Sequence, residues 1–132
     1  MPPPLDTDAI LLFAHGSRAP DLKMELAEVC RLVKDRSGAK IVEACFLDLA
    51  EPDLYYGIKM CVSGGAKKIT VVPYLLNVGT HLRRDLPILL EKVRKDFPQT
   101  RILLAPHLGV DPALADLVVR RAEAAREGDD PI

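Results

Sequence analysis

Apolar runs alternate with amphipathic segments along most of this chain. Residues 9–14 are apolar without a break, which is typical of a strand that is buried on both faces. Residues 21–33 follow with apolar positions at helical spacing, so these two segments predict a strand and then a helix. The same alternation predicts three more strands, over residues 40–46, 68–74 and 100–105, and three more helices, over residues 51–62, 82–95 and from 112 into the polar tail.

Four strands separated by helices indicate one fold class. Parallel strands need long crossover connections, which helices supply, so the pattern predicts an α/β fold with a four-stranded parallel sheet flanked by helices on both faces. We expect a disordered leader over residues 1–8, one domain over residues 9–126 and a polar tail over residues 127–132. Pro52 and Pro112 are expected in the first turns of their helices, where a missing N–H costs little. Asp111 is expected to be the N-cap of the last helix.

Composition narrows the class of protein further. Hydrophobic residues make up 48% and charged residues 28% of the 132 residues, and the net charge is −1, so neither nucleic acid nor a membrane surface is expected as a partner. No apolar stretch approaches the roughly 18–20 residues that cross a bilayer. No signal peptide is visible. The three cysteines form no CxxC pair, which favours reduced, buried thiols in a cytoplasmic protein.

Polar side chains cluster where the first three predicted strands end. His15 follows the first strand within a His-Gly-Ser-Arg turn, Asp48 follows the second, and His81 closes the loop after the third. Because ligands bind at the carboxyl ends of strands in open α/β sheets, we expect these three side chains to meet. Neutral imidazoles with a carboxylate suit divalent iron, cobalt, nickel or zinc, although a histidine taken alone is more often structural. His107 follows the fourth strand and is expected to have a loop role.

Arginines lie beside two of these clusters, as Arg18, Arg83 and Arg84. Each is consistent with a solvated surface charge, but arginine in the first turn of a helix opposes the helix dipole, so a bound anion explains them better. Phosphoryl transfer is a second interpretation of His-Gly beside arginine. Phosphatases with a histidine nucleophile carry an arginine directly before that pair, however, and Ala14 stands there in this chain. A Walker-type glycine-rich loop is also absent from the sequence.

Four sequence blocks, in this order and spacing, resemble the CbiX-type sirohydrochlorin chelatases. They read LFAHGSR, FLDLAEP, VVPYLLNVGTHLRRDLP and PHLGVDP, and the likeness extends from about residue 9 to residue 125. The resemblance implies a class II chelatase, which inserts a divalent metal ion into a tetrapyrrole without ATP. It also implies a single chelatase-like lobe that works as a homodimer, with no tightly bound cofactor and with the metal ion as a substrate. We favour Co²⁺ for that ion, with Fe²⁺ and Ni²⁺ as alternatives.

Roles for individual residues follow from the same resemblance. It implies that His15 and His81 are the catalytic pair that handles the metal, with Asp48 at the position of a carboxylate that is commonly glutamate. Aspartate is one methylene shorter, so Glu51 or Glu43 are alternative carboxylates. The candidate substrate-binding residues are Ser17, Arg18, Arg83, Arg84, Leu76 and Val78. The two apolar residues of this set are equally consistent with core or dimer contacts.

The chemistry of metal insertion fits these residue types. The macrocycle releases two pyrrole protons when the metal enters, so the site must hold a metal loosely and accept protons near neutral pH. Imidazole does both, since its ordinary pKa is about 6.5. A non-enzymatic metal carrier or tetrapyrrole-binding protein is the remaining alternative, because the aspartate at position 48 departs from the family's usual residue.

Overall fold

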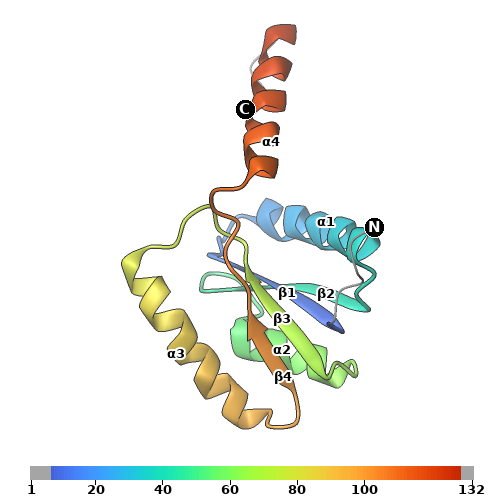
Figure 1. Ribbon diagram of the computed structural model, residues 1–132, viewed down its shortest axis with the longest axis vertical. Coiled ribbons are helices and arrows are strands. Elements are labelled where there is room, and N and C mark those ends of the chain that lie inside the picture. The colour runs from blue at the N-terminus through green and yellow to red at the C-terminus, as the bar shows by residue number, and fades with distance from the viewer. Residues whose placement is uncertain (1–6, 129–132) are drawn as a thin grey trace.

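The computed structural model describes residues 7–128 and shows one sheet with helices around it (Figure 1). Most of the expected leader and tail, residues 1–6 and 129–132, lies outside the described residues. The elements in chain order are β1 (Ala9–Ala14), α1 (Pro20–Ser37), β2 (Ile41–Phe46), α2 (Leu54–Ser63), β3 (Lys68–Pro73), α3 (Thr80–Asp96), β4 (Arg101–Leu104), α4 (Pro112–Ala124) and a short 3₁₀ turn (Ala125–Glu127).

The four strands form one parallel sheet in the order β2-β1-β3-β4, which confirms the predicted fold class. Leu11 in β1 pairs with Glu43 in β2 on one side and with Val71 in β3 on the other. The central position of β1 explains its unbroken apolar run, because all six of its residues are buried. Its carboxyl end, where His15 follows, therefore lies in the middle of the sheet edge.

Alternate residues of β1 pack against helices on opposite faces of the sheet. Leu11 and Phe13 belong to a core cluster that includes residues of α2 and α3, such as Ile58 and Leu90. Ile10 and Leu12 belong to a second cluster with residues of α1. Helices thus lie on both faces, as predicted, with α1 on one face and α2 and α3 on the other.

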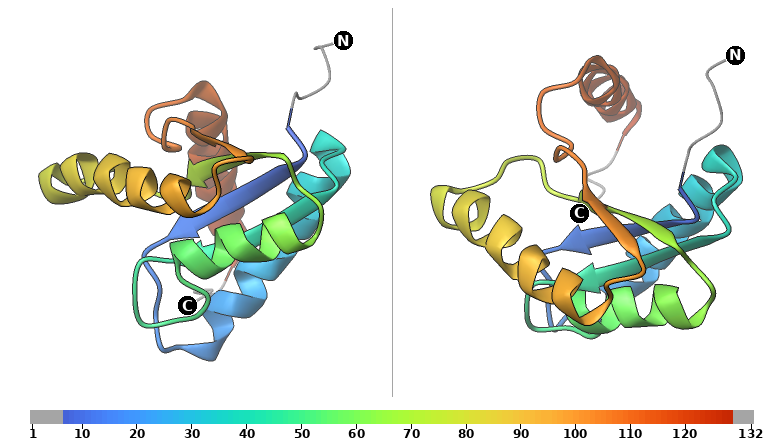
Figure 2. Two further views of the ribbon diagram at one scale, coloured as in Figure 1. Left: turned by 90° about the horizontal axis from the view of Figure 1, so that it is seen from below. Right: turned by 60° about the horizontal axis from the view of Figure 1, so that its bottom comes forward.

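Helix α4 stands apart from the sheet. Figure 1 shows it projecting beyond the strand ends, and the right view of Figure 2 shows it apart from the other helices. None of its residues is buried. Asp111 caps it as predicted, since its side chain accepts a hydrogen bond from the Ala113 N–H at 2.8 Å, and Pro112 is its first residue. A helix with apolar side chains and no buried residue leaves hydrophobic surface without a partner in this chain.

The start of α2 differs from the prediction. We expected Pro52 in the first turn, but the helix begins at Leu54 with Asp53 as its N-cap, and the Asp53 side chain accepts a hydrogen bond from the Tyr56 N–H at 2.9 Å. The Pro52 carbonyl instead accepts a hydrogen bond from the Phe46 N–H at 2.8 Å. Pro52 is therefore part of a loop that folds back on the end of β2.

The described chain begins with an anchored segment. The Asp8 carboxylate accepts hydrogen bonds from the N–H groups of Lys67 and Lys68 at 2.8 and 3.1 Å, although the sequence assigned Asp8 to the leader. These hydrogen bonds lower the pKa of the Asp8 carboxyl, because they stabilise its charged form. None of the helices within residues 7–128 is long and apolar enough to cross a membrane.

Candidate functional site

The His15 turn is shaped by a close approach of two loops. Gly16, which follows His15, has φ +101°, and a β-carbon there would clash with the carbonyl oxygen of Asp48. The Asp48 N–H donates to the His15 carbonyl at 3.1 Å, and the Leu47 N–H donates to the Ala14 carbonyl at 2.8 Å. The loop after β2 therefore continues the pairing of β2 with β1 and fixes where the exposed His15 side chain leaves the sheet.

The first turn of α3 holds His81 beside two charged residues. Arg84 Nη2 lies 3.3 Å from His81 Nδ1, and Arg84 Nε donates to the Asp85 carboxylate at 3.0 Å. Because a guanidinium can only donate, this contact is a hydrogen bond only while Nδ1 is unprotonated, and a metal ion that bound Nδ1 would displace it.

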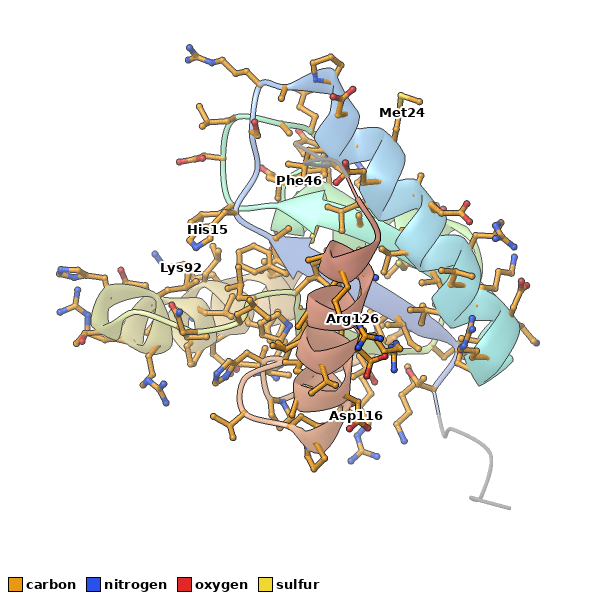
Figure 3. All side chains as sticks on the ribbon, turned by 90° about the horizontal axis from the view of Figure 1, so that it is seen from above. His15, Met24, Phe46, Lys92, Asp116 and Arg126 are labelled. Carbon is orange, nitrogen blue, oxygen red and sulfur yellow. The ribbon has the colours of Figure 1, made fainter. Side chains whose placement is uncertain are left out.

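One open cavity brings the two histidines together. It has a volume of about 660 Å³ and lies between α3 and the ends of β1 and β2. His15 and Leu47 line one wall, and the other wall consists of residues of α3 and the glycine before it. These are Gly79, Thr80, His81, Leu82, Asp85, Leu86, Ile88, Leu89 and Lys92. Figure 3 shows His15 and Lys92 on the same side of the molecule, on the strand-end turn and on α3.

The structure does not bring Asp48 into this cavity. Its neighbour Leu47 lines the cavity wall, whereas Asp48 is an exposed residue outside that lining. The alternative carboxylates, Glu43 and Glu51, lie in a different hollow at the free edge of β2. The carboxylate that shares the cavity with both histidines is Asp85.

The expected substrate-binding residues are dispersed around the molecule. The Ser17 hydroxyl accepts a hydrogen bond from the Ala19 N–H at 3.0 Å, which shapes the entry to α1, and Arg18 is exposed. Arg83 and Val78 line a separate hollow that also contains His107. Leu76 lies in a further hollow against α4. Among these six residues, Arg84 alone directly contacts a cavity histidine within the described chain.

Sequence reasoning missed Asp85 and Lys92 as site residues, although a signal for them exists. Both follow His81 on α3 at spacings of 4 and 11 residues, and Ile88 lies between them. Residues at this spacing share one face of a helix. Asp85 lies within the VVPYLLNVGTHLRRDLP block, and Lys92 lies beyond it on the same face of α3.

The three cysteines take no part in the site. All of them are free and buried, as expected. Burial raises the pKa of the Cys30 and Cys61 thiols to about 11, and it raises the pKa of Cys45 still further. Within the described residues, no cluster of three or more His, Cys, Asp or Glu side chains could enclose a metal ion. The cavity therefore offers two imidazoles and one nearby carboxylate rather than a closed metal cage.

Comparison with known proteins identifies related sequences over nearly the whole chain. The CbiX family model matches residues 9–125. The "Sirohydrochlorin ferrochelatase" of Priestia megaterium is 34% identical over 114 residues, which cover 86% of this chain and 43% of that protein. The "Sirohydrochlorin cobaltochelatase" of Sulfurisphaera tokodaii is 32% identical over 117 residues, which cover 86% of this chain and 90% of that protein. The chain thus spans less than half the length of the first relative and nearly all of the second.

A solved structure shares the fold. It is the sirohydrochlorin chelatase SirB from Bacillus subtilis subspecies spizizenii in complex with cobalt, with a TM-score of 0.78 and 33% sequence identity. The match covers 88% of this chain and 50% of the SirB chain. One lobe of about half the length of SirB is therefore present here.

Proposed function

This chain belongs to the CbiX family, and on that premise we propose that it inserts a divalent metal ion into sirohydrochlorin without ATP. The metal ion is a substrate in this proposal, and no tightly bound cofactor is required. The observation that carries the proposal is the cavity shared by His15, in the turn after β1, and His81, in the first turn of α3. An open cavity can admit a flat macrocycle, whereas a permanently held metal ion needs a closed set of protein ligands.

The two imidazoles supply the ligands for the incoming ion. Neutral imidazole binds divalent iron, cobalt and nickel, and two such ligands leave coordination positions free for water and for the ring nitrogens of the substrate. Exchange of protein ligands for ring nitrogens can then proceed stepwise. A four-ligand site of the structural kind would hold the ion too tightly for transfer.

The protons of the macrocycle need acceptors in the same cavity. Two pyrrole N–H groups lose their protons as the metal ion enters the ring. The Asp85 carboxylate lines the cavity beside His81 and keeps one oxygen free of its contact with Arg84, so it is placed to accept one proton, and an imidazole that has released the metal ion to the ring accepts the other. Asp48, in the adjacent turn, sets the path of the His15 backbone in this proposal.

We propose Co²⁺ as the physiological ion. The support comes from chain length: three relatives matched over 90–97% of their own length are named cobaltochelatases, whereas a ferrochelatase and a cobaltochelatase of Priestia megaterium are each matched over less than half. Ligand type does not separate the two ions, since imidazole and carboxylate accept both. Fe²⁺ and Ni²⁺ are therefore tested beside Co²⁺.

The test follows the visible absorbance of sirohydrochlorin with Co²⁺, Fe²⁺ and Ni²⁺ supplied separately. We expect wild-type protein to accelerate the spectral change of insertion, and His15→Ala and His81→Ala to lower the rate about a hundredfold or more. His107→Ala is the matched control, because His107 lies in a different hollow, and it should retain the wild-type rate. If the protein bound the metal ion or the macrocycle but did not accelerate insertion, it would be a carrier and not a chelatase.

We further propose that two copies of the chain assemble through α4. The three free cysteines favour a reducing compartment such as the cytoplasm for this protein. Leu114, Leu117 and Val118 of α4 line an apolar hollow of about 470 Å³ together with Tyr74 and Leu76. Val118 and Leu76 are 67% and 66% exposed, so this chain leaves the surface uncovered. A second copy is the occupant that the length of the relatives supports, since a match to 43% of the Priestia protein leaves room for another lobe.

Light scattering on a sizing column tests this assembly. Leu117→Asp should convert the dimer to a monomer, and circular dichroism should remain unchanged because no α4 residue is buried. Val119→Asp is the control, since Val119 is exposed on α4 but does not line the hollow. A monomeric wild-type protein, or equal effects of both variants, would contradict the proposal.

A further inference from the structure

We propose that Lys92 binds a peripheral carboxylate of the macrocycle and so helps to select a polycarboxylate tetrapyrrole; this inference rests on the function proposed above. Lys92 lies three helical turns beyond His81, about 16 Å along the axis of α3. Both side chains line the same cavity, with Asp85 and Ile88 between them on the same face. A single helix stripe therefore carries a candidate metal ligand at one end and a cation at the other.

Lys92 has no partner within the described chain that explains its position. It makes no hydrogen bond and no ion pair with the described residues, whereas Glu91 beside it pairs with Arg94 at 3.0 Å. Its other cavity neighbours on this part of α3 are apolar, including Ile88 and Leu89. An unpaired ammonium at the border of an apolar wall is free to bind an anion that enters with an apolar ligand.

The substrate class has the matching distribution of charge. The nitrogens that receive the metal lie at the centre of a tetrapyrrole, whereas its carboxylates lie on side chains at the periphery. A cation that binds a carboxylate must therefore stand away from the metal-handling histidines but on the same cavity wall. Lys92 meets this condition, and the apolar residues between it and His81 can contact the ring itself.

The other cations near the strand ends fit this role less well. Arg84 is already engaged by His81 and Asp85, and Arg83 lines the hollow around His107. Arg18 is exposed and does not line the cavity. Within the described residues, Lys92 is the lysine or arginine that shares a cavity with both His15 and His81.

The test is a fluorescence titration of the full chain with metal-free sirohydrochlorin. Lys92→Gln should raise the Kd about threefold to tenfold, as expected for a lost, partly exposed charge-assisted contact, and Lys92→Arg should restore most of the affinity. In the insertion assay, Lys92→Gln should raise KM and leave kcat unchanged. Co²⁺ affinity measured without macrocycle should also stay unchanged, because Lys92 is not a metal ligand.

Two controls separate a specific contact from general effects. Lys95→Gln removes a charge of the same sign from α3 at an exposed position outside the cavity, and it should bind sirohydrochlorin like the wild type. The methyl ester of sirohydrochlorin, which lacks the carboxylate charges, should bind to wild type and to Lys92→Gln equally. A Kd unchanged in Lys92→Gln, or an equal loss in Lys95→Gln or with the ester, would overturn the role of Lys92. If the wild-type protein bound no sirohydrochlorin at all, that result would contradict the proposed function as well as the role of Lys92.

Discussion

The backbone of Gly16 passes so close to the carbonyl oxygen of Asp48 that a side chain at Gly16 has no room. This relationship connects the turns after β1 and β2, and the hydrogen bond from the Asp48 N–H to the His15 carbonyl reinforces it. The position of His15 over the cavity thus depends on the absence of a β-carbon one residue away.

Gly16→Ala is expected to destabilise the fold and to displace His15. The new β-carbon would clash with the Asp48 carbonyl oxygen, and a φ of +101° is unfavourable for alanine. Backbone strain of this kind costs about 1–3 kcal/mol. Thermal unfolding should show a Tm lower by roughly 5–10 °C, and the insertion rate should fall. Gly65→Ala is the matched control, because Gly65 has φ +98° with open space around it, so it carries the strain without the clash. Equal losses in the two variants would contradict the role of the Gly16–Asp48 approach.

Asp48→Glu should strengthen metal binding. Asp48 follows Leu47, which lines the cavity, so one added methylene can extend the carboxylate toward His15. We expect roughly a tenfold gain in Co²⁺ affinity by calorimetry. Asp48→Asn should change that affinity little. A loss in Asp48→Asn as large as that in His15→Ala would mean that the aspartate already serves as a ligand.

Asp85→Asn should slow metal insertion without abolishing metal binding. The carboxylate lines the cavity with both histidines and is the group placed to accept a macrocycle proton. Loss of a proton acceptor should lower kcat about tenfold to a hundredfold. Stopped-flow absorbance measures this rate, with Asp116→Asn on α4 as the control. An unchanged kcat would assign proton acceptance to another group.

The Asp8 carboxyl should make stability depend on acid pH. Its pKa is lowered in the folded protein, first by the hydrogen bonds from the Lys67 and Lys68 N–H groups, so its contribution is present above the unfolded pKa and is lost as pH falls through the lower folded value. Asp8→Asn should therefore have a lower Tm than wild type at pH 7. The two Tm curves should converge once the pH falls below the lowered pKa of Asp8 in the folded protein. Parallel curves down to pH 2 would contradict this origin.

The three thiols should be inert in the folded protein. Burial keeps Cys30 and Cys61 protonated, with pKa values of about 11, and a thiol reacts as its thiolate. The thiol reagent DTNB at pH 8 should report almost no reaction until denaturant is added, and then three thiols per chain. Rapid reaction of one thiol in the native protein would indicate local opening around it.

Much of this fold follows from local pattern. The unbroken apolar run of β1, the helical spacing of the next segment and the capping residue Asp111 each act within a few residues, so periodicity and capping chemistry predict them. The same reasoning places His15 directly after β1, but α3 begins at Thr80, earlier than predicted, so His81 belongs to its first turn and not to the loop. Pro52 lies outside α2, contrary to the prediction, because its carbonyl accepts a hydrogen bond from the Phe46 N–H across the loop, a contact that no local rule reveals.

The sequence by itself determined the element order, the parallel sheet and the two histidines at its edge, because these depend on short-range spacing. Only the tertiary structure decided which side chains share a cavity with those histidines. Asp48 lies one residue outside the cavity, and Asp85 and Lys92 lie inside it, because the position of α3 relative to the strand ends is set by core packing. The projection of α4 also belongs to the tertiary structure, since amphipathic spacing shows that a helix has an apolar face but not what that face will cover.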